Sequence, residues 1–204
     1  MRGAARRTTR LLLGTSFLFL AGTACQTAPP PEPGSTQGSA PDLRGRTVMV
    51  LPFQQVQGFR GTPDAELLFH LQGRAGEVGW VAPDEVDEAL SRAPAMDADA
   101  RGLPVGAFLA GEVRRVGDPL YGQLRRLGAL VDAEVVLLPV RAISRPDTTG
   151  AAVIRVEAAL LALRTGRVLW YGVEEGLPGD PSDPSILASS VEALARSLLW
   201  YGSP

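Results

Sequence analysis

The sequence predicts an α/β domain with a single mixed β-sheet of about five strands and helices packed on it. Arg46 to Phe53 and Glu134 to Ile143 are almost wholly apolar, as expected of strands that are buried on both faces. Between such runs lie helical patterns that begin with a cap residue and a proline. Two further apolar runs flank Thr165 and Gly166, which predicts an antiparallel hairpin and therefore a mixed sheet.

The first half of the domain is expected to alternate strand and helix. After the first strand, Thr62 and Pro63 predict the start of a helix that runs to about Arg74. The apolar residues expected on its core side are Leu68, Leu71 and Ala75. A short strand over Val78 to Ala82 and a helix from Pro83 follow. This order predicts a parallel strand pair joined by a right-handed crossover.

The middle of the domain is less regular. Ala93 to Leu103 is small and polar and predicts a mobile loop. Val105 to Val113 is compatible with a weak strand or with an irregular apolar segment. Asp118 and Pro119 then predict the start of a helix. Its apolar stripe consists of Leu120, Leu124, Leu127 and Val131.

The last part of the domain is expected to be a strand, a hairpin and a helix. Pro139, inside the strand that ends at Ile143, indicates a bulge or a sheet edge. Ala152 to Leu163 and Arg167 to Val173 form the hairpin, and Gly166 can adopt the positive φ that its turn needs. The final helix is capped by Asp183, has a buried stripe of Leu187, Val191, Leu194 and Leu198, and carries Glu192 and Arg196 as an exposed pair.

An export signal over residues 1–24 precedes the domain. It has four arginines, an apolar core from Leu11 to Ala21 and small residues up to Ala24. The core is shorter than the roughly 20 apolar residues that a membrane-spanning helix needs. Because Cys25 follows directly, the stretch resembles a bacterial lipoprotein signal, although Gly22 stands where such signals usually carry leucine. We expect Cys25 to be lipidated; the alternative is a secreted protein with a free thiol.

Residues 25–43 are expected to form a disordered tether between the lipid anchor and the domain, residues 44–204. Gln26 to Asp42 contains no aliphatic residue larger than alanine, so it cannot bury apolar surface. A flexible chain of this length separates its ends by roughly 25 Å. In Gram-negative lipoproteins an aspartate after the cysteine usually signals inner-membrane retention, so Gln26 favours the outer membrane, with the domain in the periplasm.

Charge and cysteine content narrow the possible partners. Removing the leader takes away four of 20 basic residues and none of 22 acidic residues, so the mature chain has a formal charge of −6. Nucleic acid is therefore not an expected partner. Cys25 is the only cysteine, which excludes an internal disulfide bond.

Three segments carry a resemblance to a known superfamily. They are Val48 to Phe53, Leu127 to Leu137 and the hairpin segment Thr165 to Trp170. Their order is similar to the framework of bacterial envelope α/β domains that include the TolB amino-terminal domain, the curli secretion lipoprotein and the lipoprotein activators of penicillin-binding proteins. The resemblance implies a mixed sheet that is used for protein contacts and not for catalysis, and it brings over no catalytic residue.

Residues that could carry chemistry have simpler structural explanations. His70, the only histidine, lies four residues after Glu66 on the predicted helix, and we expect it to be solvated. Asp97 and Asp99 begin a pattern like that of a calcium loop, but Arg101 occupies its fifth position. We therefore expect no catalytic residue, no metal and no cofactor.

The sequence thus favours a non-catalytic lipoprotein, held at the outer membrane by Cys25, that binds another envelope protein or a second copy of itself. The aromatic pair Trp200 and Tyr201 follows the last helix, where exposed rings suit an interface. Phe59, in the loop after the first strand, is a further candidate. The alternative is a secreted or lipid-anchored hydrolase with an unfamiliar active site.

Overall fold

The computed structural model describes residue 32, residues 34–110 and residues 113–199. The sheet has seven strands, ordered β1-β7-β6-β5-β2-β4, and β3 pairs with β5 off this path. The strands are β1 (Ser35–Gly38), β2 (Thr47–Val50), β3 (Val56–Gln57), β4 (Gly79–Val81), β5 (Val135–Pro146), β6 (Ala152–Ala162) and β7 (Arg167–Glu175). The helices are α1 (Pro63–Arg74), α2 (Pro83–Ser91), α3 (Gly106–Ala110), α4 (Leu120–Leu130) and α5 (Pro184–Leu198).

The sheet is mixed, which confirms the predicted α/β class, although it has more strands than expected. β2 pairs in parallel with β4 and with β5, so the predicted parallel pair is present. β6 runs antiparallel to both β5 and β7 and forms the predicted hairpin, where Gly166 has a φ of 67°. The β5–β6 register shifts between Pro139 and Arg141, which confirms the predicted irregularity.

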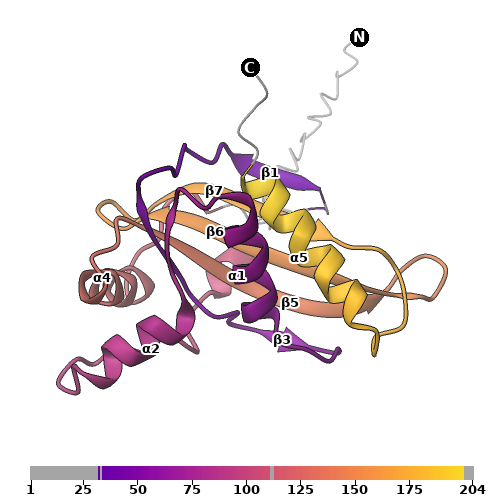
Figure 1. Cartoon of the computed structure of the whole chain (residues 1–204), viewed down its shortest axis with the longest axis horizontal. Coiled ribbons are helices and arrows are strands. Elements are labelled where there is room, and N and C mark those ends of the chain that lie inside the picture. Colours follow the sequence, from indigo (N-terminus) through magenta and orange to yellow (C-terminus); the bar gives the residue numbers. More distant parts are fainter. Residues whose placement is uncertain (1–31, 33, 111–112, 200–204) are drawn as a thin grey trace, which may run out of the picture.

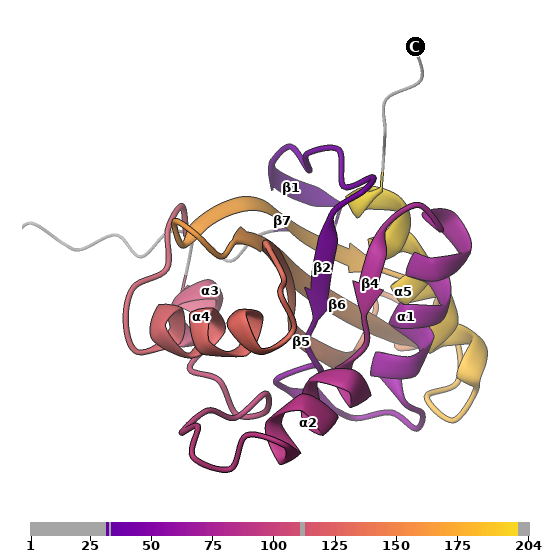
Figure 2. The same ribbon diagram turned by 60° about the vertical axis from the view of Figure 1, so that its left-hand side comes forward.

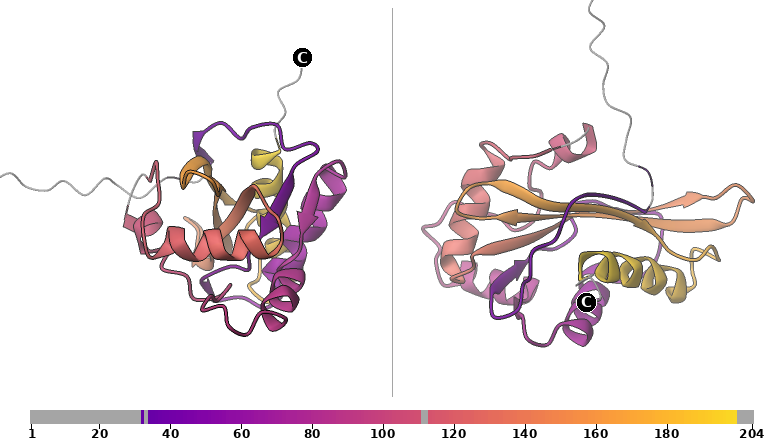
Figure 3. Two further views of the ribbon diagram at one scale, coloured as in Figure 1. Left: turned by 90° about the vertical axis from the view of Figure 1, so that its left-hand side faces the viewer. Right: turned by 90° about the horizontal axis from the view of Figure 1, so that it is seen from above.

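Helices cover both faces of the sheet and create two apolar cores. α1 and α5 lie on one face, whereas α2, α3 and α4 lie on the other (Figures 1 and 2). Side chains of one strand alternate between the cores: Val48 and Val50 face α1 and α5, and Met49 faces the opposite layer. Seen from above, α5 follows the long β5–β6–β7 ribbon, whereas α4 covers one end of it (Figure 3).

The predicted helical stripes are largely confirmed. All four apolar residues of the α5 stripe are buried, and the Asp183 side chain accepts a hydrogen bond from Ser185 N at 2.8 Å. In α4 the first three residues of the stripe are buried and Val131 is partly exposed. In α1, Leu67 is buried where we expected Leu68. The core side of this helix follows the i, i+4 series Pro63, Leu67 and Leu71. None of the described helices is long and apolar enough to cross a membrane.

The expected tether is not disordered throughout. Ser35 to Gly38 form the edge strand β1, which pairs antiparallel with β7. Leu43, which we assigned to the tether, is completely buried in the α1–α5 core. β7 would otherwise present unpaired backbone groups at the sheet edge, and β1 satisfies them although its side chains bury little apolar surface. The folded part therefore begins about ten residues earlier than predicted.

The segment between α2 and α4 also differs from the expectation. Gly106–Ala110 is the short helix α3, not a strand, and its Phe108 is buried. The preceding loop has no helix or strand, but it is anchored by Gln54. The Gln54 side chain donates to the Ala100 carbonyl at 3.1 Å and accepts from Leu103 N at 2.8 Å. Its small residues pack into the second core, so this loop is part of the folded layer.

Candidate interaction surface

The residues that the sequence assigned to a functional site are not brought together. Cys25, Trp200 and Tyr201 lie outside the described residues. Phe59 is partly buried and packs against the α1–α5 core. Lipidation at Cys25 and an interface at the two C-terminal aromatic residues therefore remain predictions.

Exposed apolar side chains mark a different surface. Phe69 on α1 is 70% exposed, and Leu177, in the connection between β7 and α5, is 72% exposed. Leu177 N donates a hydrogen bond to Ser189 Oγ of α5 at 2.9 Å, so Leu177 lies on the same layer as α5. We call Phe69 and the adjacent, partly exposed Leu68 the apolar face; Leu177 is a separate exposed side chain of the same layer. The sequence carries a signal for it, because α1 has more apolar residues than one helical stripe can bury.

His70 is less exposed than we predicted. Its side chain is only 17% exposed, and its ring meets the Phe69 ring edge-on with centroids 5.4 Å apart. Nε2 lies 3.2 Å from Oε1 of Glu66, the predicted i, i+4 neighbour, but without hydrogen-bond geometry. The expectation of a fully solvated histidine is therefore wrong, because Phe69 and the helix surface cover one side of the ring.

A buried ion network, which sequence reasoning missed, lies at the centre of the sheet. Glu157 of β6 is completely buried. Its Oε1 accepts hydrogen bonds from Arg141 at 2.6 Å and from Arg155 at 2.7 Å, and its Oε2 accepts one from the Tyr171 hydroxyl at 2.7 Å. Tyr171 in turn stacks on Phe108 of α3, with ring centroids 5.7 Å apart. The network joins the three long strands to one helix.

The network is organised for stability. Burial alone would raise the pKa of Glu157, but the hydrogen bonds from Arg141, Tyr171 and Arg155 outweigh it and hold the pKa below its usual value. Burial and the neighbouring carboxylate raise the pKa of Tyr171. Glu157 is therefore a completely buried anion that accepts three hydrogen bonds from side chains of the fold.

Acidic side chains also gather beyond the carboxyl end of the parallel strand β2. The Asp64 carboxylate accepts a hydrogen bond from Phe53 N at 2.7 Å, and burial raises its pKa. Arg101 binds Asp87 at 2.8 Å and lies 4.0 Å from Asp64, so it links the loop before α3 to α1 and α2. Asp99 accepts a hydrogen bond from Arg101 N, a local turn. The described residues contain no group of three or more His, Cys, Asp or Glu side chains that could hold a metal ion.

No protein-family model matches the sequence, and no curated protein sequence matches it. Solved structures similar to the chain include the LpoB C-terminal domain from Salmonella enterica, which is 15% identical, with a TM-score of 0.41 over 67% of this chain and 86% of that one. They also include the PelC dodecamer from Paraburkholderia phytofirmans, 15% identical, with a TM-score of 0.44 over 80% and 95% of the two chains. Lipoprotein GNA1162 from Neisseria meningitidis is 18% identical, with a TM-score of 0.43 over 78% and 99%.

Of these three structures, GNA1162 is a lipoprotein by name.

Proposed function

We propose that the chain is an exported lipoprotein that is anchored to the outer membrane through Cys25 and binds other envelope proteins through its α/β domain without catalysing a reaction. The leader that ends at Cys25 supports the anchor, and Gln26 supports the outer membrane. The buried carboxyl group of Glu157 and the partly buried one of Asp64 already bind side-chain and backbone donors of the fold itself. This arrangement favours a binding domain over an enzyme.

The exposure of Phe69 carries the proposal of protein binding. Leu67 and Leu71 already fill the core beneath α1, so the fold does not need a third large apolar side chain there. Phe69 is 70% exposed beside the partly exposed Leu68, so the two side chains offer an apolar contact that a partner could bury. Aromatic anchors of this kind contribute much of the binding energy at protein interfaces.

The anchor is tested by Cys25→Ala. This variant should lose lipidation and lipoprotein-type processing, and it should leave either the unprocessed precursor or a soluble exported product. Acyl labelling and fractionation of membranes measure both effects. Normal processing and unchanged fractionation of the variant would refute the anchor.

The interface is tested by Phe69→Ala, with Gln72→Ala as the control. Both residues are exposed on α1, but only the first belongs to the apolar face. We expect Phe69→Ala to weaken partner binding or self-association by about 1 to 3 kcal/mol and Gln72→Ala to have little effect. Cross-linking in intact envelopes, followed by recovery of the acylated protein, measures the association. Equal recovery of partners by both variants would show that the apolar face is not the interface.

A further inference from the structure

Four exposed arginines gather at one end of the sheet: Arg114, Arg115, Arg164 and Arg167. The two segments that carry them lie side by side. Arg115 and Arg167 form an antiparallel bridge, and Val168 N donates to the Arg114 carbonyl at 3.0 Å. Arg115 Nε donates to the Thr165 carbonyl at 2.9 Å. We call these four residues the arginine patch.

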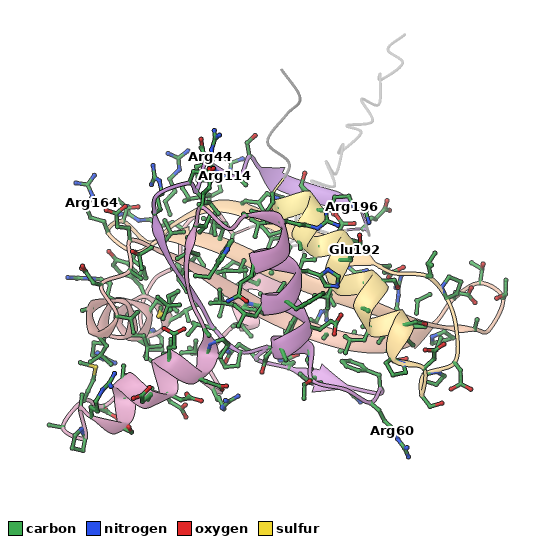
Figure 4. All side chains as sticks on the ribbon, viewed as in Figure 1. Arg44, Arg60, Arg114, Arg164, Glu192 and Arg196 are labelled. Atoms are coloured by element: carbon green, nitrogen blue, oxygen red, sulfur yellow. The ribbon has the colours of Figure 1, made fainter. Side chains whose placement is uncertain are left out.

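The patch concentrates positive charge on a chain whose mature form is acidic. Residues 113–117 and 163–168 contain no acidic residue, and the first of these ranges is flanked by Asp118 and by Glu112, which lies outside the described residues. Even with both of these carboxylates counted, the four arginines leave an excess of two positive charges. Figure 4 shows Arg114 and Arg164 toward the edge where β1 lies, whereas Arg60 points away on the opposite side.

A pocket of 520 Å³ opens within the patch. The pocket lies at the edge of β7, between two segments that pair with this edge. β1 pairs with residues 170–173, and residues 114–116 pair with residues 166–168. Arg114 and Arg167 line it together with Gln37 and Ser39. Guanidinium groups bind phosphate in a bidentate manner, and amide and hydroxyl groups add hydrogen-bond donors. The lining therefore suits a phosphate group.

The patch also lies close to the predicted lipid anchor. Nine positions separate Cys25 from Gly34, so the chain between them spans at most about 30 Å. From there β1 runs along β7 toward the pocket, where Gly38 and Pro41 are among the lining residues. The segment that carries the anchor thus leads directly to the arginine patch.

We propose that the arginine patch binds the phosphate groups of anionic membrane lipids and holds the domain against the membrane to which Cys25 anchors it. The proposal rests on the lipoprotein function above, because only a membrane-anchored domain is kept within reach of the headgroups. Basic side chains beside an anionic lipid surface act additively, and salt screens their attraction.

The test uses the full mature chain with Cys25→Ser, so that binding does not depend on an attached lipid. Vesicles of phosphatidylcholine alone are compared with vesicles that also contain phosphatidylglycerol, in low and in high salt. We expect flotation with the anionic vesicles in low salt only. Changing Arg114→Gln and Arg167→Gln together should lower the apparent affinity by about tenfold or more, whereas Arg60→Gln should change it less than about twofold. Arg164→Gln, at an exposed turn, should lower the apparent affinity for anionic vesicles without changing the circular dichroism spectrum of the domain.

Several outcomes would overturn the proposal. They are absence of vesicle binding, equal binding to neutral and anionic vesicles, and equal losses in the Arg60→Gln control and the patch variants. Titration with inorganic phosphate tests the other source of the same chemistry: phosphate binding without vesicle binding also overturns it. Failure of vesicle binding leaves the Cys25→Ala processing result untouched, so the lipoprotein proposal and the patch proposal fail separately.

Discussion

Replacing Glu157 by glutamine should destabilise the domain more than any exposed charge change. The substitution keeps the size of the side chain but removes the negative charge that faces Arg141 and Arg155. Arg155 is only 8% exposed as a side chain, so its guanidinium would be left in a poorly solvated position with less compensation. An uncompensated buried charge is a strongly destabilising change.

The expected magnitude follows from the burial of the partners. Removing one member of a buried ion pair costs about 3 to 5 kcal/mol. The glutamine oxygen can still accept hydrogen bonds, although without a negative charge, and the Arg141 side chain is 22% exposed and reaches water. We therefore expect a loss of about 3 kcal/mol in the free energy of unfolding. For a domain of this size, that loss lowers Tm by about 10 °C.

Urea unfolding at several pH values provides the assay. Because the pKa of Glu157 is lowered in the folded state, its charge stabilises the fold fully above the unfolded pKa, and the contribution is lost as the pH falls through the folded value. The difference between the wild type and Glu157→Gln should thus be constant near neutral pH and shrink below about pH 4.

Glu88→Gln is the matched control. Glu88 also pairs with an arginine, Arg92, but its side chain is 67% exposed, so its loss should cost less than about 1 kcal/mol. If Glu157→Gln is as stable as this control, or if its deficit does not shrink on acidification, the network does not stabilise the fold as argued.

Two further predictions concern the ends of the domain. Trp200→Ala or Tyr201→Ala should weaken association by about 1 to 3 kcal/mol, as measured by sedimentation. In thermal unfolding either variant should lose less stability than Leu194→Ala, which should lose about 2 to 5 kcal/mol. If both aromatic variants unfold as easily as Leu194→Ala, the aromatic pair belongs to the core. Gly38→Ala should expose the β1 region to proteases more than Gly34→Ala does. Both glycines have a positive φ that strains an alanine, but only at Gly38 would the Cβ also clash, 2.4 Å from the Leu169 carbonyl oxygen.

The regular elements of the fold could be predicted because their signals are local. The α5 stripe follows the helical period, and the Thr165 and Gly166 pair fixes the hairpin turn. The sequence predicted less well which face of α1 points into the core. Apolar residues lie on two of its faces, and only packing against α5 selects the face of Leu67 and Leu71. β1 was missed because it is held by backbone pairing with β7 and not by apolar side chains.

The Glu157 network could not be assembled from sequence for a related reason. Its carboxylate receives hydrogen bonds from β5, from its own strand and from β7, and the β5–β6 bulge after Pro139 sets which β5 residue lies opposite it. The available signal was a single glutamate inside an apolar strand. A buried carboxylate needs compensating donors, so an isolated acid in such a run indicates arginines on the neighbouring strands.

The early start of the fold also constrains how a partner could reach the domain. With β1 taken from the tether, an anchor at Cys25 would allow the domain a separation of about 30 Å at most from the membrane. In Figure 1 the β1 edge lies at the top, whereas α1 lies on the near side of the sheet. When the arginine patch faces the bilayer, α1, the helix that carries Phe69, therefore lies at the side of the domain. A partner that covers Phe69 would have to stand beside the domain at the same height, which favours another membrane-bound envelope protein or a second anchored copy of this chain.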